Sequence, residues 1–579
     1  MIAAKFDQIW CVDFEFGASA TGRPAPRCLV AIEARTGRRI EMWDEELRAA
    51  PCPPFDLGPR SLYVAFAAQA ELGCHLALGW PLPGNVMDLY AEFRAATNGL
   101  AQSSSLLSAL TWFGLPHIDI RDKDMFRDLA LRGGPYTEAE RQSLVGYCAS
   151  DVMALVELLP RLVTADSLNY ALLRGREVRA IAVMEDTGIP VDLESLERIR
   201  TGRHQVRQHL VADTPRSMGL YEGGVFKMDR LERLVEDRGM AWPRHESGRL
   251  NINKFTFKAM AGLYPELKPV CELRKTMDSL REFNLPAGED ARMRPRLRPF
   301  ASTTGRNQPA AKEHPFLHPK WLRGLIRPPP GRALAYVDWA QQEFGVAAAL
   351  SGDRGMQAAY QAHDPYIAFG QQAGLLPPSA TKASHPVERA RLKACALGVL
   401  FGKAERSLAE DLGLSVAEAT ELVQAHRRAF PHFWTWSQGI VDHAMLFREA
   451  NTVFDWRLHV GHHENPRSIM NFPMQANGAE LMRLAAVFAV EDGIQVCTPV
   501  HDAFLIEAGD DDIEDAVARM RAAMNKASRI VLDGFELGTD SVVVRHPASL
   551  LDAEHRATWD LVQWILGTAA CADVHQIDA

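Results

Sequence analysis

The sequence predicts an α/β protein built from several domains, and two features of its pattern support this. Two short apolar segments, residues 9–16 (IWCVDFEF) and 333–340 (ALAYVDWA), have the composition of strands, carry acidic residues and are followed by helical sequence. Long helical stretches separate further strand-like segments. Strands that alternate with helices are typical of α/β domains, and 579 residues suffice for more than one of them.

The predicted elements follow in order along the chain. A strand at residues 9–16 and a helix at 66–80 precede a long helix at 136–162. Helical sequence at 163–188 ends in a Thr-Gly-x-Pro turn. A Pro/Gly/Arg-rich loop at 285–306 leads to the strand at 333–340 and a helix at 341–350. Mainly helical sequence follows, and then come strands at 453–459 and 496–507 with a helix at 474–490 between them.

Composition narrows the class of protein. The nine cysteines are scattered without a CxxC pair, which predicts neither a zinc module nor a disulfide framework. No apolar run of 18 residues is present, and the first ten residues lack a basic region followed by an apolar run. We therefore expect no membrane span and no secretory signal. The scattered cysteines indicate a reducing cytoplasm as the expected location.

The charge of the chain is unevenly distributed. The net charge is −9, yet residues 268–332 contain fourteen Lys and Arg against six Asp and Glu. A basic segment inside an acidic protein suits a local groove for a polyanion. A solvated arginine-rich surface explains the charge equally well.

Acidic residues form a first candidate catalytic group near the N-terminus. Asp13 and Glu15 are two residues apart in the strand and therefore lie on one face. Tyr147 and Asp151 share a face of the helix at 136–162. Phosphodiester cleavage with two metal ions needs several carboxylates around Mg²⁺ or Mn²⁺, and a tyrosine can orient the attacking water. The alternative is a pair of solvated acids on an edge strand, which the apolar neighbours disfavour.

A second group of candidate residues lies in the C-terminal two-thirds. Asp338 ends a predicted strand, Glu343 follows in the next helix, and Asp502 lies in another apolar strand context. Between them, Arg389 and Lys393 share one helix face. Two aspartates for metal ions and a cationic helix face are what nucleotidyl transfer requires. Taken alone, a basic pair at this spacing is more often a solvated helix face.

The first group resembles the DEDDy 3′→5′ exonucleases, in particular the ribonuclease-H-like proofreading domain of family A DNA polymerases. The motifs that carry the resemblance are Val12-Asp13-Phe14-Glu15 and Tyr147-Cys148-Ala149-Ser150-Asp151. The family expects an aspartate in its second motif, where this sequence has Glu71 in Ala70-Glu71-Leu72-Gly73. The resemblance implies that Asp13, Glu15, Glu71 and Asp151 bind metal and that Tyr147 is catalytic. Asp88 matches a structural aspartate of these domains.

The second group resembles the right-hand polymerase of family A, the DNA polymerase I and phage-type enzymes. Thr304-Gly305-Arg306 is similar to the family's TGR element, and Asp338-Trp339-Ala340-Gln341-Gln342-Glu343 is similar to motif A. Val500-His501-Asp502 is similar to motif C. Motif B, the nucleotide-binding fingers helix, is represented by Arg389, Lys393, Gly398 and Gly402.

This second resemblance implies a role for each matched residue. Asp338 and Asp502 would hold the metal ions of catalysis, and Glu343 would be the steric gate against a ribose 2′-hydroxyl. Nucleotide binding would fall to Arg389, Lys393, Leu397, Phe401 and Glu343, with Lys393 also catalytic. DNA binding would fall to Arg306, Arg467, Asn471, Gln475 and His501.

Some positions depart from the family pattern. Ala503 stands where motif C continues with glutamate, and Leu397 stands at an aromatic position of motif B. Phe401 replaces a second motif B tyrosine, and Tyr366 replaces a common fingers histidine. None of these changes removes an aspartate expected to hold metal.

The resemblance divides the chain into an exonuclease domain at residues 1–165 and a polymerase domain at 166–579. The thumb is expected at about 175–300, the palm at 301–350 and 453–579, and the fingers at 351–452. We expect a monomeric, template-directed DNA polymerase with proofreading, using two Mg²⁺ or Mn²⁺ ions per site. Its partners would be primer–template DNA, dNTPs and replisome proteins. Many bacterial homologues carry a 5′-nuclease domain for which there is no room before residue 9, so the resemblance implies a role in phage replication. The location it implies is the cytoplasm of a bacterial cell or of a phage-infected host.

Three alternatives to this reading of the sequence remain. One is an exonuclease whose polymerase half has decayed, and another is a non-catalytic DNA-binding protein. The joint presence of Asp338, Arg389, Lys393 and Asp502 argues against both. An RNA polymerase is the third, and Glu343 argues against it.

Overall fold

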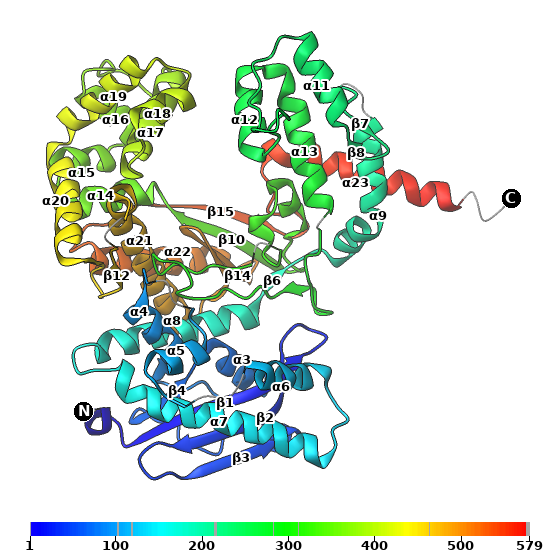
Figure 1. Cartoon of the computed structure of the whole chain (residues 1–579), viewed down its shortest axis with the longest axis vertical. Helices are drawn as coiled ribbons and strands as arrows, with labels where there is room; N and C mark the ends of the chain where they lie inside the picture. Colours follow the sequence, from blue (N-terminus) through cyan, green and yellow to red (C-terminus); the bar gives the residue numbers. More distant parts are fainter. Residues whose placement is uncertain are drawn as a thin grey trace. The chain divides into compact units, whose positions relative to one another are not determined.

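The computed structural model describes residues 2–100, 103–116, 120–212, 217–281, 283–310, 312–461 and 464–574. The chain folds into two compact units. The first unit comprises residues 1–188, 296–308 and 335–543, and the second comprises residues 189–295, 309–334 and 544–579. Both predicted catalytic groups therefore belong to the first unit. Figure 1 labels the helices and strands described below. The exonuclease and polymerase domain boundaries given above stay predictions.

A five-stranded sheet organises the N-terminal part of the first unit, residues 2–165, which we call the N-terminal domain. Its strand order is β3-β2-β1-β4-β5, with β1 antiparallel to β2 and parallel to β4. The strands are β1 (Gln8–Ala18), β2 (Pro24–Glu33), β3 (Arg39–Trp43), β4 (Ser61–Ala65) and β5 (Val86–Asp88). The helices are α1 (Ile2–Lys5), α2 (Asp44–Ala49), α3 (Gln69–Ala77), α4 (Leu89–Thr97), α5 (Leu106–Trp112), α6 (Ile120–Arg132) and α7 (Glu138–Leu162).

Helix α7 is the main helix against this sheet. Thr137 caps its N-terminus: the Thr137 hydroxyl accepts from the Glu140 amide, and the Glu140 carboxylate accepts from the Thr137 amide. Its apolar face, including Leu144 and Val152, lies in a core shared with β1, β2 and β4. Among the described helices, α7 is the one whose length and apolar composition would suffice to cross a membrane.

A second sheet of the first unit has the order β13-β14-β10-β15, and we call it the palm sheet. Its strands are β10 (Arg332–Trp339), β13 (Gln495–Val500), β14 (Ala503–Gly509) and β15 (Thr539–Arg545). Helices α21 (Pro466–Glu491) and α22 (Ile513–Val531) pack together, and α22 contacts β14. Helix α8 (Leu168–Thr187) contacts both sheets, through β5 and β13.

Three predicted elements differ from the structure. The strand predicted at 496–507 is two strands, because His501 takes a left-handed backbone conformation (φ +56°) that closes a tight turn at residues 501–502. The strand predicted at 453–459 is a hairpin of β11 (Glu449–Asn451) and β12 (Arg457–His459), with Asp455 also at positive φ. Helix α21 begins at residue 466 rather than 474, because Asn465 caps it and Pro473 is accommodated within it.

A group of helices at residues 342–447 completes the first unit and covers the predicted fingers. These helices are α14 (Gln342–Ser351), α15 (Arg354–Gln361), α16 (Pro365–Gln372), α17 (Pro386–Leu400), α18 (Glu405–Leu412), α19 (Val416–Ala429) and α20 (Pro431–Phe447). His426 is fully buried among aromatic rings of α16 and α20, including Phe369 and Phe433. Burial lowers the pKa of His426 to about 3, so the ring is neutral and serves as core.

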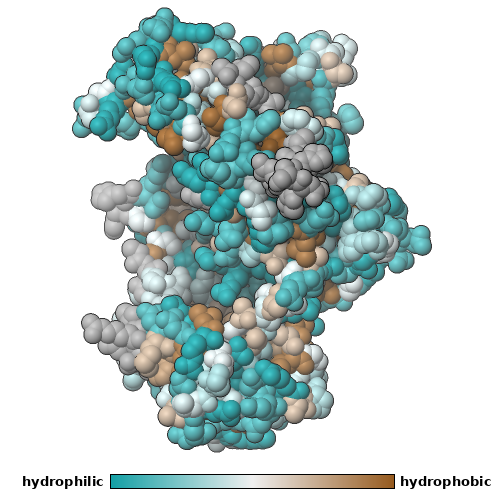
Figure 2. All heavy atoms as spheres, turned by 90° about the vertical axis from the view of Figure 1, so that its right-hand side faces the viewer, coloured by the Kyte–Doolittle hydropathy of each residue, from teal (hydrophilic) through white to brown (hydrophobic). Residues whose placement is uncertain are grey.

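The second unit is mainly helical. Its helices are α9 (Leu193–Ala212), α11 (Met228–Asp237), α12 (Lys254–Leu263), α13 (Lys268–Arg281) and α23 (Ala553–Val574), with 3-10 helices η1 (Pro265–Leu267), η2 (Pro315–Leu317) and η3 (Lys320–Leu325). It also contains two short antiparallel strand pairs. Strand β6 (Ile189–Pro190) pairs with β9 (Arg292–Met293), and β7 (Tyr221–Glu222) pairs with β8 (Val225–Phe226). On the molecular face in Figure 2, hydrophilic side chains predominate and hydrophobic ones form small separate patches.

Candidate active sites

The first candidate site is built on β1, the central strand of the N-terminal sheet. Asp13 and Glu15 are half-buried and alternate with the buried residues Val12 and Phe14. Alternation along a strand places the two carboxylates on one face, as the sequence predicts. The Cys148 thiol of α7 donates to the Asp13 carbonyl at 3.2 Å, which ties this helix to the strand at the site.

Glu71, the least regular residue of the predicted motifs, lies at the same place. It is buried on α3, and its Oε2 accepts the Phe14 amide at 2.8 Å, between the two acids of β1. Burial raises the pKa of Glu71 well above its ordinary value, and the charges of Asp13, Glu15 and Asp151 raise it further. The structure therefore brings all four predicted carboxylates together.

Tyr147 of α7 lies near the carboxylates of this group. Its hydroxyl hydrogen-bonds the Asp151 side chain, and burial followed by the Asp151 charge raises its pKa. The Phe126 ring stacks on the Tyr147 ring at 4.9 Å and 18°. The phenol is therefore neutral and held in place, which suits a group that orients water.

Asp88 has a different task from the other acids of this domain. Its carboxylate accepts the amides of Ala67 at 2.8 Å and Tyr90 at 3.0 Å, so it caps α4 and fixes the start of α3. Burial raises its pKa to about 7. Asp88 is thus engaged by backbone, as the family resemblance implies.

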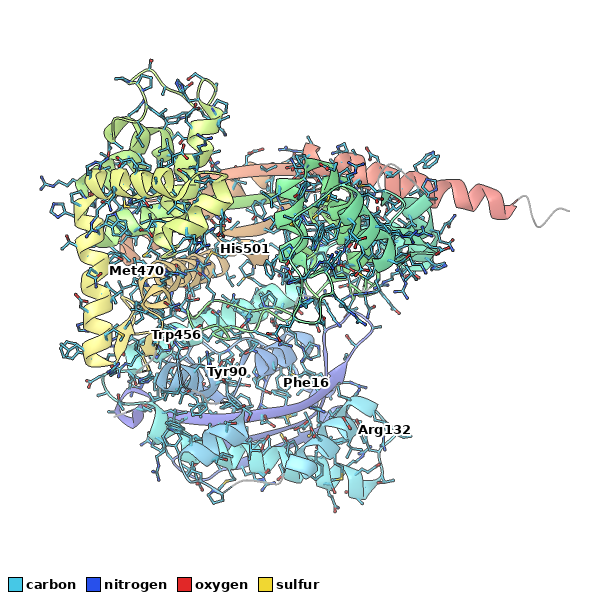
Figure 3. The ribbon with its side chains drawn as sticks, turned by 45° about the horizontal axis from the view of Figure 1, so that its top comes forward. Phe16, Tyr90, Arg132, Trp456, Met470 and His501 are labelled. Carbon is cyan, nitrogen blue, oxygen red and sulfur yellow. The ribbon has the colours of Figure 1, made fainter. Side chains whose placement is uncertain are left out.

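The second candidate site lies where β10 ends. The Trp339 amide donates to the Asp502 carbonyl at 3.2 Å, which places the residue after Asp338 beside the turn of the β13–β14 hairpin. Burial raises the pKa of Asp338 to about 6, and the charges of Asp502 and Asp540 add to the shift. His501 occupies the same turn and is labelled in Figure 3.

Glu343 and Gln475 extend this site along α14 and α21. The Gln475 side chain donates from Nε2 to Glu343 Oε1 at 3.2 Å. Arg306 donates from Nε to the Gln475 carbonyl at 3.2 Å, and its charge, like that of Asp502, acts on Glu343. Three residues from distant segments of the sequence therefore come together near Asp502.

The basic residues of α17, Arg389 and Lys393, contact residues of α16 and its N-terminal cap that the sequence did not predict. Arg389 forms an ion pair with Asp364 at 2.5 Å, and both Arg389 and Lys393 lie over the ring of Tyr366, at 5.4 and 5.7 Å. Burial raises the pKa of Tyr366 to about 12. Sequence reasoning missed Asp364, although its place before Pro365 is a helix-capping signal.

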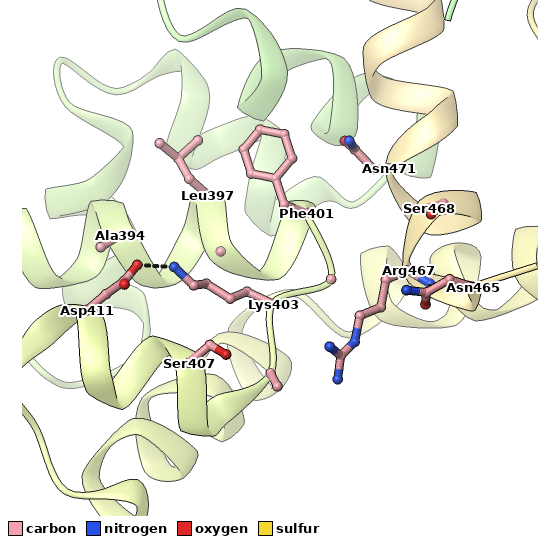
Figure 4. Close-up of a pocket in the computed structure, with 13 residues that line it drawn as sticks. Ala394, Leu397, Phe401, Lys403, Ser407, Asp411, Asn465, Arg467, Ser468 and Asn471 are labelled. Carbon is pink, nitrogen blue, oxygen red and sulfur yellow. Dashed lines mark hydrogen bonds and ion pairs between the residues drawn. The ribbon is translucent and has the colours of Figure 1, made fainter. Parts of the chain in front are cut away.

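A cavity of about 670 Å³ unites other predicted residues (Figure 4). Leu397 and Phe401 line it from α17, and Arg467 and Asn471 line it from α21. Lys403 also lines it and forms an ion pair with Asp411. Gly402 is required here, because a Cβ at its positive φ would lie 2.9 Å from the Arg467 Cβ.

The carboxylate groups suit hard divalent cations. Buried acids whose charges raise one another's pKa leave negative charge that a cation would balance, and carboxylate oxygens are the ligands of Mg²⁺ and Mn²⁺. Within the described residues, no group of three or more Asp, Glu, His or Cys side chains is arranged so that it could hold a metal ion by itself. Water and substrate oxygens would complete the coordination, as is usual for Mg²⁺.

Comparison with known proteins explains the second site. Residues 270–539 match the sequence profile described as DNA polymerase family A. This part of the chain is therefore similar to the family A DNA polymerases. The matched range contains the predicted family A motif residues of the second site, from Arg306 to Asp502.

Curated relatives of family A agree with this assignment. The chain is 24% identical over 431 residues to "DNA polymerase I, thermostable" of Thermus filiformis, covering 68% of this chain and 50% of that protein. It is 24% identical over 447 residues to "DNA polymerase I" of Chloroflexus aurantiacus, covering 69% of this chain and 46% of that protein. The chain thus spans about half the length of the curated relatives it matches.

A solved structure shares the fold over almost the whole chain. It is described as the POL domain of Pol1 from M. smegmatis in complex with DNA primer–template and dNTP. The TM-score is 0.71 at 18% identity, covering 93% of this chain and 95% of that chain. The predicted family A polymerase fold is therefore confirmed.

Proposed function

We propose that the chain is a template-directed DNA polymerase that extends a primer 3′-hydroxyl with dNTPs. The observation that carries this proposal is that Arg306, Glu343 and Gln475 are joined to one another near Asp502, which itself lies near Asp338, within the residues that match family A. The DNA and dNTP named for the structural neighbour support the substrate class.

The chemistry follows from the residues of the site. Asp338 and Asp502 would hold two divalent cations, which activate the 3′-hydroxyl and stabilise charge on the triphosphate. Arg389 and Lys393 neutralise the triphosphate, for which Arg389 must leave Asp364. Glu343, held by Gln475, occupies the space beside the sugar.

We also propose a 3′→5′ exonuclease activity for the N-terminal domain, which serves proofreading. Asp13, Glu15, Glu71 and Asp151 converge in one buried group, and Tyr147 is held against Asp151. These carboxylates would hold metal ions that activate water, and the neutral Tyr147 hydroxyl would orient that water. Phage replication and the cytoplasmic location stay predictions from the sequence.

Substitutions at the two sites test both activities. Asp338→Asn or Asp502→Asn is expected to abolish primer extension and to leave degradation of a single-stranded primer intact. Asp13→Ala combined with Glu15→Ala is expected to do the reverse. Extension within about tenfold of wild type in either aspartate variant, a barrier change of only about 1.4 kcal/mol, would contradict the polymerase assignment.

A further inference from the structure

The loop that carries Arg306 has a strained backbone. Arg298 and Phe300 have positive φ values of +49° and +57°, and Gly305 has +72°. Non-glycine residues in this region cost of order 1 kcal/mol or more each and persist when the surroundings fix them. Residues 296–308 therefore depend on contacts from outside the loop.

Two residues of the N-terminal domain supply many of these contacts: Arg94 within α4, and Asn98 directly after it. The Arg94 guanidinium donates to the carbonyls of Phe300, Ala301 and Ser302 at 3.2, 3.5 and 3.4 Å. Asn98 is fully buried, and its Nδ2 donates to the Thr303 carbonyl at 2.7 Å. Four consecutive carbonyls of the loop are thus held by this domain.

Asn98 also joins the N-terminal domain to the β11–β12 hairpin. Its Nδ2 donates to the Arg457 carbonyl at 2.8 Å, and its own carbonyl accepts the His459 amide at 2.9 Å. Trp456 donates from Nε1 to the same Thr303 carbonyl at 2.9 Å. In Figure 3 Trp456 lies close to Tyr90, and both belong to one hydrophobic cluster.

The far side of the loop rests on α21. The Arg483 guanidinium lies over the Phe300 ring at 4.7 Å and donates to the Gly305 carbonyl at 3.5 Å. The Arg306 amide donates to Ser302 Oγ at 2.8 Å. Moving the carbonyls at 300–303 would therefore move Arg306, whose side chain reaches Gln475 in the polymerase site.

We propose that Arg94 and Asn98 of the N-terminal domain are positioning residues of the polymerase site, acting through residues 296–308 on Arg306. This inference rests on the proposed polymerase function. It makes the N-terminal domain part of the polymerase machinery, apart from any degradation of DNA that it performs. A displacement of about 1 Å at a catalytic group can cost roughly 10²-fold in rate.

The test compares single-nucleotide extension by the full-length wild type, Asn98→Ala and Arg94→Lys. We expect the maximal extension rate to fall about tenfold or more in Asn98→Ala, with a smaller change in the KM for dNTP. Degradation of a single-stranded primer should stay within about twofold, because the Asp13 site is not contacted. Arg94→Lys keeps the positive charge but removes the planar guanidinium that donates to three carbonyls. It is a milder change, which we expect to leave the protein folded.

A matched control and a double-mutant cycle separate positioning from general destabilisation. Asn85 donates to two carbonyls within its own domain, those of Pro59 and Ser61, so Asn85→Ala should lower stability without slowing extension. In an Arg306→Ala background, Asn98→Ala should have little further effect on the extension rate.

Two outcomes would overturn the inference while leaving the polymerase function intact. One is a folded Asn98→Ala or Arg94→Lys enzyme that extends primers at the wild-type rate. The other is full additivity of Asn98→Ala and Arg306→Ala. A wild-type enzyme that extends no primer would instead contradict the proposed function itself.

Discussion

Glu343 is the residue on which we expect sugar selection to depend in the proposed polymerase. Its carboxylate is held by Gln475 at 3.2 Å and lies beside Arg306 and Asp502. In the resembling family a motif B tyrosine is usual nearby, but Phe401 has no hydroxyl and lines the cavity shared with Arg467. Side-chain bulk at residue 343, fixed from α21, is therefore what we expect to exclude a 2′-hydroxyl.

Glu343→Ala is predicted to admit ribonucleotides, because it removes that bulk. The ratio of kcat/KM for a dNTP to that for its rNTP should fall by roughly 10²-fold, a free-energy change of about 2.7 kcal/mol. Glu343→Gln is the matched control, since it keeps the bulk and can still bind Gln475. An unchanged ratio in Glu343→Ala would mean that Glu343 only serves the helix after Asp338.

Glu71 is the residue at which the predicted exonuclease motifs depart from the family that they resemble. Glu71→Gln is predicted to slow 3′→5′ degradation strongly, because an amide is a poorer ligand for hard cations, while its oxygen can still accept the Phe14 amide. Glu71→Asp should also slow it, because the shorter side chain cannot reach both Phe14 and the other acids. Asp88→Asn serves as control and should lower the melting temperature more than the rate. Wild-type degradation by Glu71→Gln would remove Glu71 from the site.

At the scale of elements, a glycine of helix α21, Gly478, leaves room for the side chains of Arg306 and Gln342. A Cβ on Gly478 would lie 3.0 Å from Arg306 Nη2 and 3.1 Å from Gln342 Oε1. Alanine usually stabilises a helix interior by about 1 kcal/mol relative to glycine. Here the added methyl crowds the residues that reach the polymerase site.

Gly478→Ala is predicted to slow primer extension several-fold through this crowding, with little loss of helix content. Gly439 lies inside α20, where a Cβ would meet no other part of the described chain within 4 Å, so Gly439→Ala is the control. It should raise the unfolding free energy by about 0.5–1 kcal/mol and leave extension unchanged. Equal extension rates in the two variants would show that Arg306 tolerates the methyl group.

The C-terminal turn of α8 holds the start of the loop at residues 296–308 through a titratable contact. Glu185 Oε1 accepts the Leu297 amide at 2.6 Å, and burial raises the pKa of Glu185 to about 7 from 4.5. The folded chain therefore binds this proton more tightly than the unfolded chain does. The contribution of Glu185 to stability is full below pH 4.5 and is lost as the pH rises through 7.

Glu185→Gln is predicted to remove this pH dependence, because the amide stays neutral and can still accept the Leu297 amide. The melting temperature of the variant relative to wild type should increase between pH 5 and pH 8, because wild type loses about 2–3 kcal/mol of unfolding free energy over this range. Thermal melts of both proteins across this range provide the measurement. A constant difference would place the Glu185 pKa outside the window.

At the scale of the whole molecule, the sequence carries more signal for candidate catalytic residues than for the residues that support them. The DxE of β1, Tyr147 and Asp151, and the aspartates at residues 338 and 502 could be proposed as site residues because metal and phosphate chemistry restricts the residue types. Glu71 could be placed only through the family pattern, and its bond to Phe14 is a tertiary contact. Asp364 and Asn98 carry no such signal, because ordinary capping and buried amides look the same in a sequence.

The N-terminal domain and the palm share a buried network of charges. Arg174 binds Glu92 through two bonds of 2.7 Å, and Arg483 pairs with Glu177 and Glu480. All five side chains are buried. Removal of one partner from such a network leaves an uncompensated charge and typically costs about 3–5 kcal/mol.

Arg483→Met is therefore predicted to destabilise both parts together. The temperatures of half-inactivation for primer extension and for single-strand degradation should fall by similar amounts. Arg519→Met is a suitable control, since its ion pair with Asp492 is exposed and worth little. Loss of extension with an unchanged inactivation temperature for degradation would show that the two parts melt separately.

The ion pair between Arg389 and Asp364 has a consequence for nucleotide selection under the proposed function. A ligand that recruits Arg389 must displace a carboxylate already bound at 2.5 Å, so part of the binding free energy of every nucleotide is spent on exchanging one anion for another. The apparent affinity for a nucleotide equals the intrinsic affinity multiplied by the fraction of molecules in which Arg389 is released from Asp364. A triphosphate carries the most negative charge and competes best with Asp364. Diphosphates and monophosphates compete less well, so their binding is weakened more.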